Sequence, residues 1–266
     1  MNQLMDSRWP VSELTLKVLD LDAQAAFYTE FGLQPLAQTP EVAVLGARGR
    51  PLLRLKALRH GLPRPPRTAG LYHFALLLPD EARLGSFLLH AAGMKVAFVG
   101  ASDHVVSQAL YFQDPEGNGI EVYADRPRST WTWNQGRVAI DTLPLDLERL
   151  ARAAEGEAPA LPEDTLLGHM HLNVADLDRS QAHYEAMGME LTAAVPGARF
   201  LSWDGYHHHL GINVWQGRDV APVEPEVTGL EAFAVTHPAG AAGRADPDGV
   251  RVDVAPPERT VAGALS

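Results

Sequence analysis

The stretch that decides the fold is "HMHLNVADLDRSQAHYEAMGM" (residues 169–189), because it repeats "ELTLKVLDLDAQAAFYTEFGL" (residues 13–33). The two segments align at a constant offset of 156 residues, and the identical pairs include Leu16/Leu172, Val18/Val174, Asp20/Asp176, Tyr28/Tyr184 and Gly32/Gly188. Each copy reads as an alternating strand, an Asp cap, an amphipathic helix of about three turns and a Gly stop. The pattern therefore predicts a structural repeat.

Two further copies follow the same layout. "HFALLLPDEARLGSFLLHAAGM" (73–94) carries Asp80 where the first copy has Asp20, and "GLEAFAVTHP" (229–238) echoes "GLYHFALLLP" (70–79). The turn "ADPDGVRVDVAP" (245–256) echoes "QDPEGNGIEVYA" (113–124), but the offset falls from 159 to 132 residues between these two matches. The fourth copy thus lacks 27 residues, the helix included. We predict an α+β chain of tandem βαβββ modules whose fourth module is truncated.

The modules group into two predicted domains. Modules one and two fill residues 11–125, and module three with the shortened module four fills residues 165–256. Residues 126–164 form a linker with two tryptophans and an expected helix around residues 147–154.

Composition excludes several classes of function. The chain has 266 residues, 46% hydrophobic and 21% charged, as in globular proteins with real cores. A net charge of -11 argues against a nucleic-acid partner, and no apolar run is long enough to cross a membrane. With no cysteine and no apolar signal segment in Met1–Pro10, we expect a cytoplasmic protein. Any metal must be held by nitrogen and oxygen ligands, and eleven histidines are available.

Several motifs together resemble a known superfamily. They are "GLYHFALLLP", "SDHVVSQALYFQDPEGNGIEVYADRPRSTW", "GHMHLNV" and "DGYHHHLGIN". The chain resembles the vicinal oxygen chelate superfamily, and within it the bacterial extradiol dioxygenases of the catechol 2,3-dioxygenase type. The resemblance covers most of the chain. It implies two vicinal oxygen chelate domains, paired modules that form a cup, and metal ligands on first and last strands.

Alternation along the strands sorts the modules that could hold this metal. Met170, Leu172 and Val174 are expected to face the core, so His169 and His171 share the opposite face. His73 stands at the matching position of module two, and Glu121 lies on the last strand of that module. The candidate ligands are therefore His73, Glu121 and His169, the two-His-one-carboxylate set of non-heme Fe(II) oxygenases, with Mn(II) as the alternative.

Modules one and four lack such residues. In module one, Glu13 stands at the position of the ligand histidine and Arg54 at the position of the ligand carboxylate. We interpret these two residues as an ion pair. Module four has Ala232 at the histidine position and keeps only Asp253. Module two must therefore face module three, within one chain or between subunits of a homo-oligomer.

The resemblance also implies polar groups beside the metal. "SDH" ending at His104, and Tyr111 four residues before the turn Pro115, match positions that lie next to iron in the extradiol family. His104 is the expected acid/base and Tyr111 the expected holder of a substrate oxygen. In "YHHHLGINVW" (206–215), alternation places His207 and His209 on the cup side and His208 toward the core or a sheet edge. We expect His209 to hydrogen-bond substrate or to serve as an occasional fourth ligand, and contact of His171 or His207 with the metal stays open.

The sequence thus favours an extradiol dioxygenase that opens a small aromatic diol with O₂. The first alternative is a glyoxalase-type lyase or isomerase, in which a fourth protein ligand completes the site. The second is a non-catalytic protein of the bleomycin-resistance kind that binds an aromatic molecule in a metal-free cup.

Overall fold

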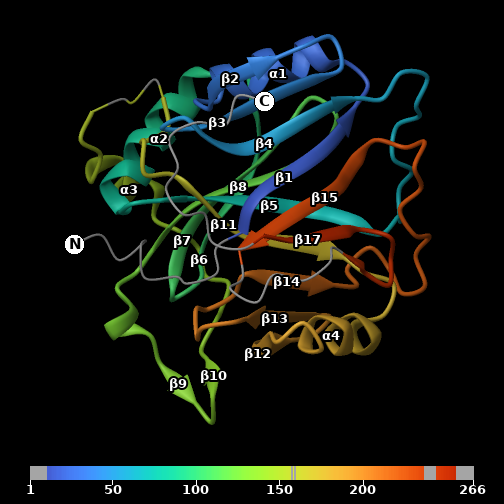
Figure 1. Cartoon of the computed structure of the whole chain (residues 1–266). Helices are drawn as coiled ribbons and strands as arrows, with labels where there is room; N and C mark the ends of the chain where they lie inside the picture. Colours follow the sequence, from blue (N-terminus) through green and yellow to red (C-terminus); the bar gives the residue numbers. More distant parts are fainter. Residues whose placement is uncertain (1–10, 157, 159, 237–243, 256–266) are drawn as a thin grey trace.

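The computed structural model describes residues 11–156, 158, 160–236 and 244–255 (Figure 1). The N-terminal ten residues, which were expected to hold no signal segment, and residue 256, the last of the expected second domain, lie outside the described residues. Within the described part of the chain, no helix is both long and apolar enough to cross a membrane.

The chain folds as repeated modules of strands with one helix each. The first module consists of β1 (Val11–Val18), α1 (Leu21–Glu30), β2 (Gln34–Gln38), β3 (Val42–Ala47) and β4 (Arg50–Ala57). The second consists of β5 (Gly70–Leu78), α2 (Glu81–Gly93), β6 (Ala97–Asp103), β7 (Ser107–Gln113) and β8 (Gly119–Asp125). The third consists of β11 (Leu166–Asn173), α4 (Leu177–Glu185), β12 (Glu190–Val195), β13 (Ala198–Ser202) and β14 (Leu210–Asn213). The described part of the fourth consists of β15 (Gly229–Thr236), β16 (Arg244–Ala245) and β17 (Arg251–Ala255). The α+β class and the repeated modules are confirmed.

The repeated residues explain where the helices begin and end. Asp20, Asp80 and Asp176 each accept a hydrogen bond from the backbone amide three residues later, which caps α1, α2 and α4. Gly32 and Gly188 follow α1 and α4 with φ of 112° and 89°, a region that favours glycine.

The linker between modules two and three is partly ordered secondary structure. Its elements are η2 (Arg128–Thr130), β9 (Trp133–Asn134), β10 (Arg137–Val138) and α3 (Leu147–Arg152). The helix expected around residues 147–154 is therefore present as α3, which packs against α2. The β9–β10 hairpin projects from the body of the protein (Figure 1).

Strand pairing joins modules from different halves of the chain. β5 runs antiparallel to β11, with His73 opposite His171, and β1 runs antiparallel to β15. The two module pairs meet where Val11 of β1 pairs with Leu167 of β11. Module two thus faces module three within a single chain, and module one faces module four.

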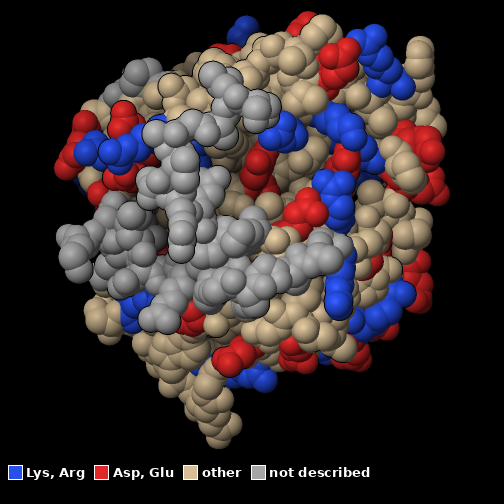
Figure 2. Space-filling view, in the orientation of Figure 1, with Lys and Arg blue, Asp and Glu red and all other residues tan. Residues whose placement is uncertain are grey.

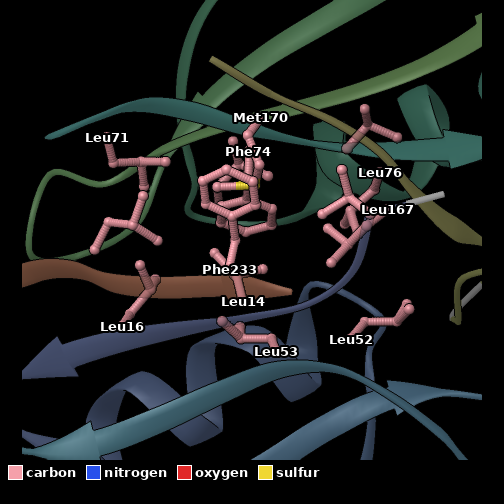
Figure 3. Packing of buried hydrophobic residues seen from close by; sticks show 14 of the residues in the cluster. Leu14, Leu16, Leu52, Leu53, Leu71, Phe74, Leu76, Leu167, Met170 and Phe233 are labelled. Atoms are coloured by element: carbon pink, nitrogen blue, oxygen red, sulfur yellow. The ribbon is translucent and has the colours of Figure 1, made fainter. Parts of the chain in front are cut away.

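The main core lies between these two module pairs. Leu14 and Leu16 of β1 and Phe233 of β15 pack toward Phe74 of β5 and Met170 of β11 (Figure 3). All five side chains are at most 3% exposed. The apolar face of each first strand is buried in this core. The side chains of the opposite face therefore point away from the core and can line a cavity.

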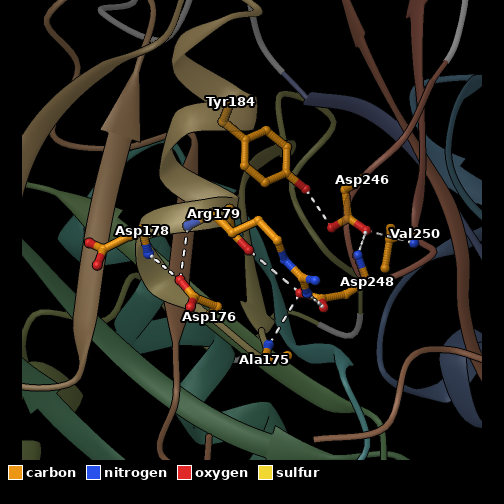
Figure 4. Close-up of polar contacts among 9 residues, drawn as sticks. Ala175, Asp176, Asp178, Arg179, Tyr184, Asp246, Asp248 and Val250 are labelled. Atoms are coloured by element: carbon orange, nitrogen blue, oxygen red, sulfur yellow. Dashed lines mark hydrogen bonds and ion pairs between the residues drawn. The ribbon is translucent and has the colours of Figure 1, made fainter. Parts of the chain in front are cut away.

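A buried tyrosine fastens the helix of one module to the turn of the next. Tyr184 of α4 donates its hydroxyl hydrogen to Asp246 (2.9 Å), which also accepts the backbone amides of Asp248 and Val250 (Figure 4). The first half repeats this contact, since Tyr28 of α1 donates to Asp114 of the turn before β8 (2.8 Å). The repeated tyrosine and the D-P-x-G aspartate are therefore two ends of one clamp.

We expect Tyr28→Phe and Tyr184→Phe each to lower the free energy of unfolding by about 1.5–3 kcal/mol, because each removes the hydroxyl donor from a buried carboxylate. Burial raises the pKa of Asp114 and of Asp246, which reflects how poorly these sites tolerate an unpaired charge. Urea denaturation measures the change, with the exposed tyrosine variant Tyr72→Phe as control. Equal stability of all three variants would show that the clamp is dispensable.

Candidate metal centre and its cavity

Three neighbouring strands bring the candidate ligands together. His73 of β5 and His169 of β11 lie on either side of Glu121 of β8, whose Oε2 is 2.9 Å from His73 Nε2 and 3.1 Å from His169 Nε2. One ligand atom from each residue lies within 4.8 Å of the others. The residues are 6%, 3% and 1% exposed for His73, Glu121 and His169. Among the described residues this is the group of histidines and carboxylates whose geometry could hold a metal ion.

The donor set fits a metal ion electrostatically. Burial alone would raise the pKa of Glu121, but the adjacent His169 and His73 hold that pKa well below its usual value. Burial lowers the pKa of His169, which favours the neutral imidazole that a metal requires. In the described part of the chain, His73 Nε2 has no hydrogen-bond partner despite its proximity to Glu121. A buried carboxylate beside two imidazoles offers the oxygen and nitrogen donors that a divalent cation binds.

This centre lies in the wall of a cavity of about 640 Å³. His104 and Tyr111 line the same cavity, as do His171 and His208. Six residues were predicted from the sequence to form the site. Five of them line this one cavity, namely His73, His104, Tyr111, Glu121 and His169.

His104 and Tyr111 form a hydrogen-bonded pair. His104 Nδ1 lies 2.8 Å from the carbonyl oxygen of Asp141, which can only accept, so Nδ1 carries the hydrogen. In the neutral ring Nε2 then accepts, and Tyr111 donates its hydroxyl hydrogen to it at 2.6 Å. Burial, reinforced by the charge of Glu121, raises the pKa of Tyr111 well above its ordinary value, so the phenol stays protonated.

The linker supplies a wall that the sequence did not predict. The backbone of Leu143 exchanges two hydrogen bonds of 2.9 Å with Asp103 at the end of β6. This places residues 140–142 along the cavity, and the Asp141 carbonyl described above orients His104. The segment read as a connection thus closes the cup and fixes a cavity side chain.

The three consecutive histidines differ from the expected arrangement. His208 lines the cavity, with its ring centroid 4.1 Å from that of His169, whereas His207 and His209 are not among the described residues that line it. The backbone bends at His207 and His209, and β14 begins only at Leu210, so strand alternation does not apply here. The expected position of His209 on the cup side is therefore corrected, because His209 is not among the described residues that line the cavity.

His209 instead belongs to a buried cluster behind the cavity. Its Nδ1 lies 3.1 Å from Ser202 Oγ, and its ring lies against Tyr206 and Trp203. Burial lowers the pKa of His209 to about 3, so the ring is neutral. The His171 ring lies 4.8 Å from the His73 ring and in the cavity, outside the group of three candidate ligands.

His207 lies between Asp125 and His208 and contacts both side chains. His207 Nε2 is 2.9 Å from a carboxylate oxygen of Asp125, and its Nδ1 is 2.7 Å from Nδ1 of His208. Since a carboxylate accepts, a neutral His207 donates from Nε2 and accepts at Nδ1. His208 must then donate from Nδ1, which leaves the lone pair on its Nε2. The sequence shows three adjacent histidines but no signal that selects the middle one.

In the other module pair, the described residues at the corresponding positions form ion pairs and no group that could hold a metal. Arg54 of β4 lies 2.9 Å from Glu13 of β1, which confirms the interpretation of these residues as an ion pair. Lys56 pairs with Glu231 in the same way, and Arg251 lies 3.1 Å from Asp253. Figure 2 shows acidic and basic side chains next to one another rather than in separate patches.

Comparisons with known proteins agree with this architecture. Residues 11–122 match the model of the Glyoxalase/Bleomycin resistance protein/Dioxygenase superfamily. The chain is 41% identical over 241 residues to a catechol-2,3-dioxygenase of Bacillus subtilis (strain 168), covering 88% of this chain and 84% of the relative.

Solved structures share the fold at low identity. A putative dioxygenase from Bacillus subtilis aligns over 94% of this chain and 86% of its own, with a TM-score of 0.61 and 13% identity. Glyoxalase I from Zea mays aligns over 96% and 95%, with a TM-score of 0.55 and 16% identity.

Proposed function

Because the chain belongs to the glyoxalase, bleomycin resistance protein and dioxygenase superfamily, we propose that it is an extradiol ring-cleaving dioxygenase. The observation that carries the proposal is the convergence of His73, Glu121 and His169 in a cavity that also holds the His104–Tyr111 pair. The proposed substrates are O₂ and a catechol-type aromatic diol, and the proposed setting is the cytoplasm.

His73, Glu121 and His169 would hold Fe(II), with Mn(II) as the alternative ion of the same ligand preference. An ion held by these three residues would keep coordination positions open for a catechol and O₂, and it would supply the chemistry for opening the ring next to the diol. A set of three ligands favours this reaction over a glyoxalase-type site with four. The polar cavity groups favour an enzyme over a protein that only binds an aromatic molecule.

Three other side chains of the cavity, those of His208, Tyr111 and His104, have different roles in proton transfer and hydrogen bonding to the substrate. His208 offers a lone pair at Nε2, so it can accept a proton from a catechol hydroxyl. Tyr111 donates a hydrogen bond from its hydroxyl to His104, and the phenolic oxygen can in turn accept a hydrogen bond from the substrate. His104, held at Nδ1 by the Asp141 carbonyl, can take or return a proton through this pair. We therefore propose His208, rather than His209, as the third polar group at the substrate.

The test is anaerobic reconstitution with Fe(II), followed by catechol and air. We expect a yellow ring-opened product whose mass equals that of catechol plus two oxygen atoms, both labelled when ¹⁸O₂ is supplied. A parallel sample loaded with Mn(II) tests the alternative ion. If the protein isomerises a glutathione hemithioacetal but consumes no O₂ in the presence of catechol, it catalyses the glyoxalase-type reaction instead.

A further inference from the structure

The cavity continues outward from the candidate metal centre to a mouth with aromatic walls. Tyr72 of β5 and Trp215, just after β14, both line the cavity, and their ring centroids lie 5.3 Å apart at 74°. The Trp215 ring also lies 5.3 Å from that of His171, which is itself 4.8 Å from the ring of His73. A continuous row of rings thus leads from the metal centre to the surface.

The position of Trp215 is built by its neighbours. Its backbone amide bonds Asn213 Oδ1 (3.1 Å), and its indole nitrogen lies 3.5 Å from the carbonyl oxygen of Pro196. Gly197 has a φ of 78°, and a Cβ there would lie 3.2 Å from the indole ring, so glycine permits this close approach. The ring is therefore seated against the β12–β13 turn while it remains 50% exposed.

The mouth presents apolar surface that the described part of the chain leaves exposed. Tyr72, Val99 and Val195 line the cavity and are 39%, 61% and 36% exposed. Grouped exposed apolar side chains at the rim of a cavity are typical of a ligand-binding surface. A volume of about 640 Å³ lies within the range of pockets that take ligands larger than one ring.

The charge of the cavity excludes one class of substituent. Neither lysine nor arginine occurs among the described residues that line it, whereas Glu121 and Asp141 do. A carboxylate on the substituent, away from the metal centre, would thus be desolvated with no lysine or arginine among the described lining residues to pair with it.

We propose that the substrate is a catechol with an uncharged, apolar substituent, such as an aryl group, that packs against Tyr72 and Trp215. This inference rests on the proposed function for the catechol moiety, and it adds the substituent. The diol lies at the metal centre, and the substituent extends along the row of rings to the mouth.

Binding without turnover tests the proposal directly. Anaerobic calorimetry on the Fe(II)-loaded protein compares catechol, 3-phenylcatechol, 4-phenylcatechol and 3,4-dihydroxyphenylacetate. The better of the two phenylcatechols is expected to bind roughly 10–100-fold more tightly than catechol, because its second ring is removed from water. Dihydroxyphenylacetate is expected to bind more weakly than catechol.

The variant Trp215→Ala tests whether the tighter binding of the phenylcatechol depends on the contact with Trp215. This variant should reduce the advantage of the phenylcatechol by about tenfold, the value of one aromatic contact and its buried area, while catechol keeps its affinity. Trp133→Ala is the matched control, because Trp133 is similarly exposed (43%) but lies on the β9–β10 hairpin and does not line the cavity. It should leave both affinities unchanged.

The outcomes separate this inference from the proposed function. Tight binding of dihydroxyphenylacetate, equal binding of catechol and both phenylcatechols, or an equal loss for every ligand in Trp215→Ala would overturn the inference. Turnover is then measured in air with the same compounds. If the predicted order of affinities holds but no compound is cleaved, the proposed function fails and the substituent site stands.

Discussion

His169→Ala is expected to remove the metal as completely as His73→Ala does, although the two residues are 96 positions apart. β11 and β5 are adjacent antiparallel strands, so the two imidazoles reach Glu121 from neighbouring positions of one sheet. Loss of an outer-shell hydrogen-bond partner typically weakens metal binding by 10–100-fold, so loss of a ligand should weaken it by more than about 100-fold. Iron stoichiometry after anaerobic gel filtration measures the effect, and circular dichroism checks the fold.

The ion pairs of the other module pair provide matched controls. Glu13→Gln and Asp253→Asn remove carboxylates from strands related to β5 and β8 by the repeat, but each carboxylate lies beside an arginine. Both variants should keep their metal and their turnover. If Glu13→Gln lost iron while His169→Ala retained it, the centre would have to lie within the N-terminal half.

The centre was predictable from the sequence because it depends on regular strands. Alternation assigned Met170 and Leu172 to the core, and placed His169 with His171 on the opposite face. Repeat alignment then transferred the ligand position from His169 to His73. The first argument uses only the two-residue period of a strand, and the second uses only the similarity between two repeated modules. Both features can be read directly from the sequence.

The rest of the cavity depends on tertiary contacts that leave no periodic signal. Residues 207–209 precede β14 on a bent backbone, so alternation selected His209 where the structure presents His208. The linker reaches the cavity through backbone hydrogen bonds between Asp103 and Leu143, and backbone groups are the same in every residue. The sequence therefore predicted the positions of the candidate ligands better than it predicted the residues that line the rest of the cavity.

His208→Gln is expected to lower kcat by roughly 10²–10⁴, the usual contribution of a positioned acid or base, while the protein keeps its iron. The Asp125–His207 pair directs the lone pair of His208 Nε2 away from His207, and the ring lies against His169 in the cavity wall. Glutamine retains a polar group of similar reach but cannot carry a proton between substrate and product. His104→Ala should cause a loss of the same order, since it removes the partner of Tyr111.

His209→Gln separates the two assignments of the histidine run. His209 is neutral at neutral pH, as its low pKa requires, and it lies behind the cavity against Tyr206 and Trp203. Its substitution should therefore lower thermal stability but leave kcat per folded molecule nearly unchanged. Single-turnover rates of anaerobically formed substrate complexes, mixed with O₂, compare the variants after their iron content has been matched. A slow His209→Gln beside a fast His208→Gln would return the acid/base role to the residue that strand alternation selected.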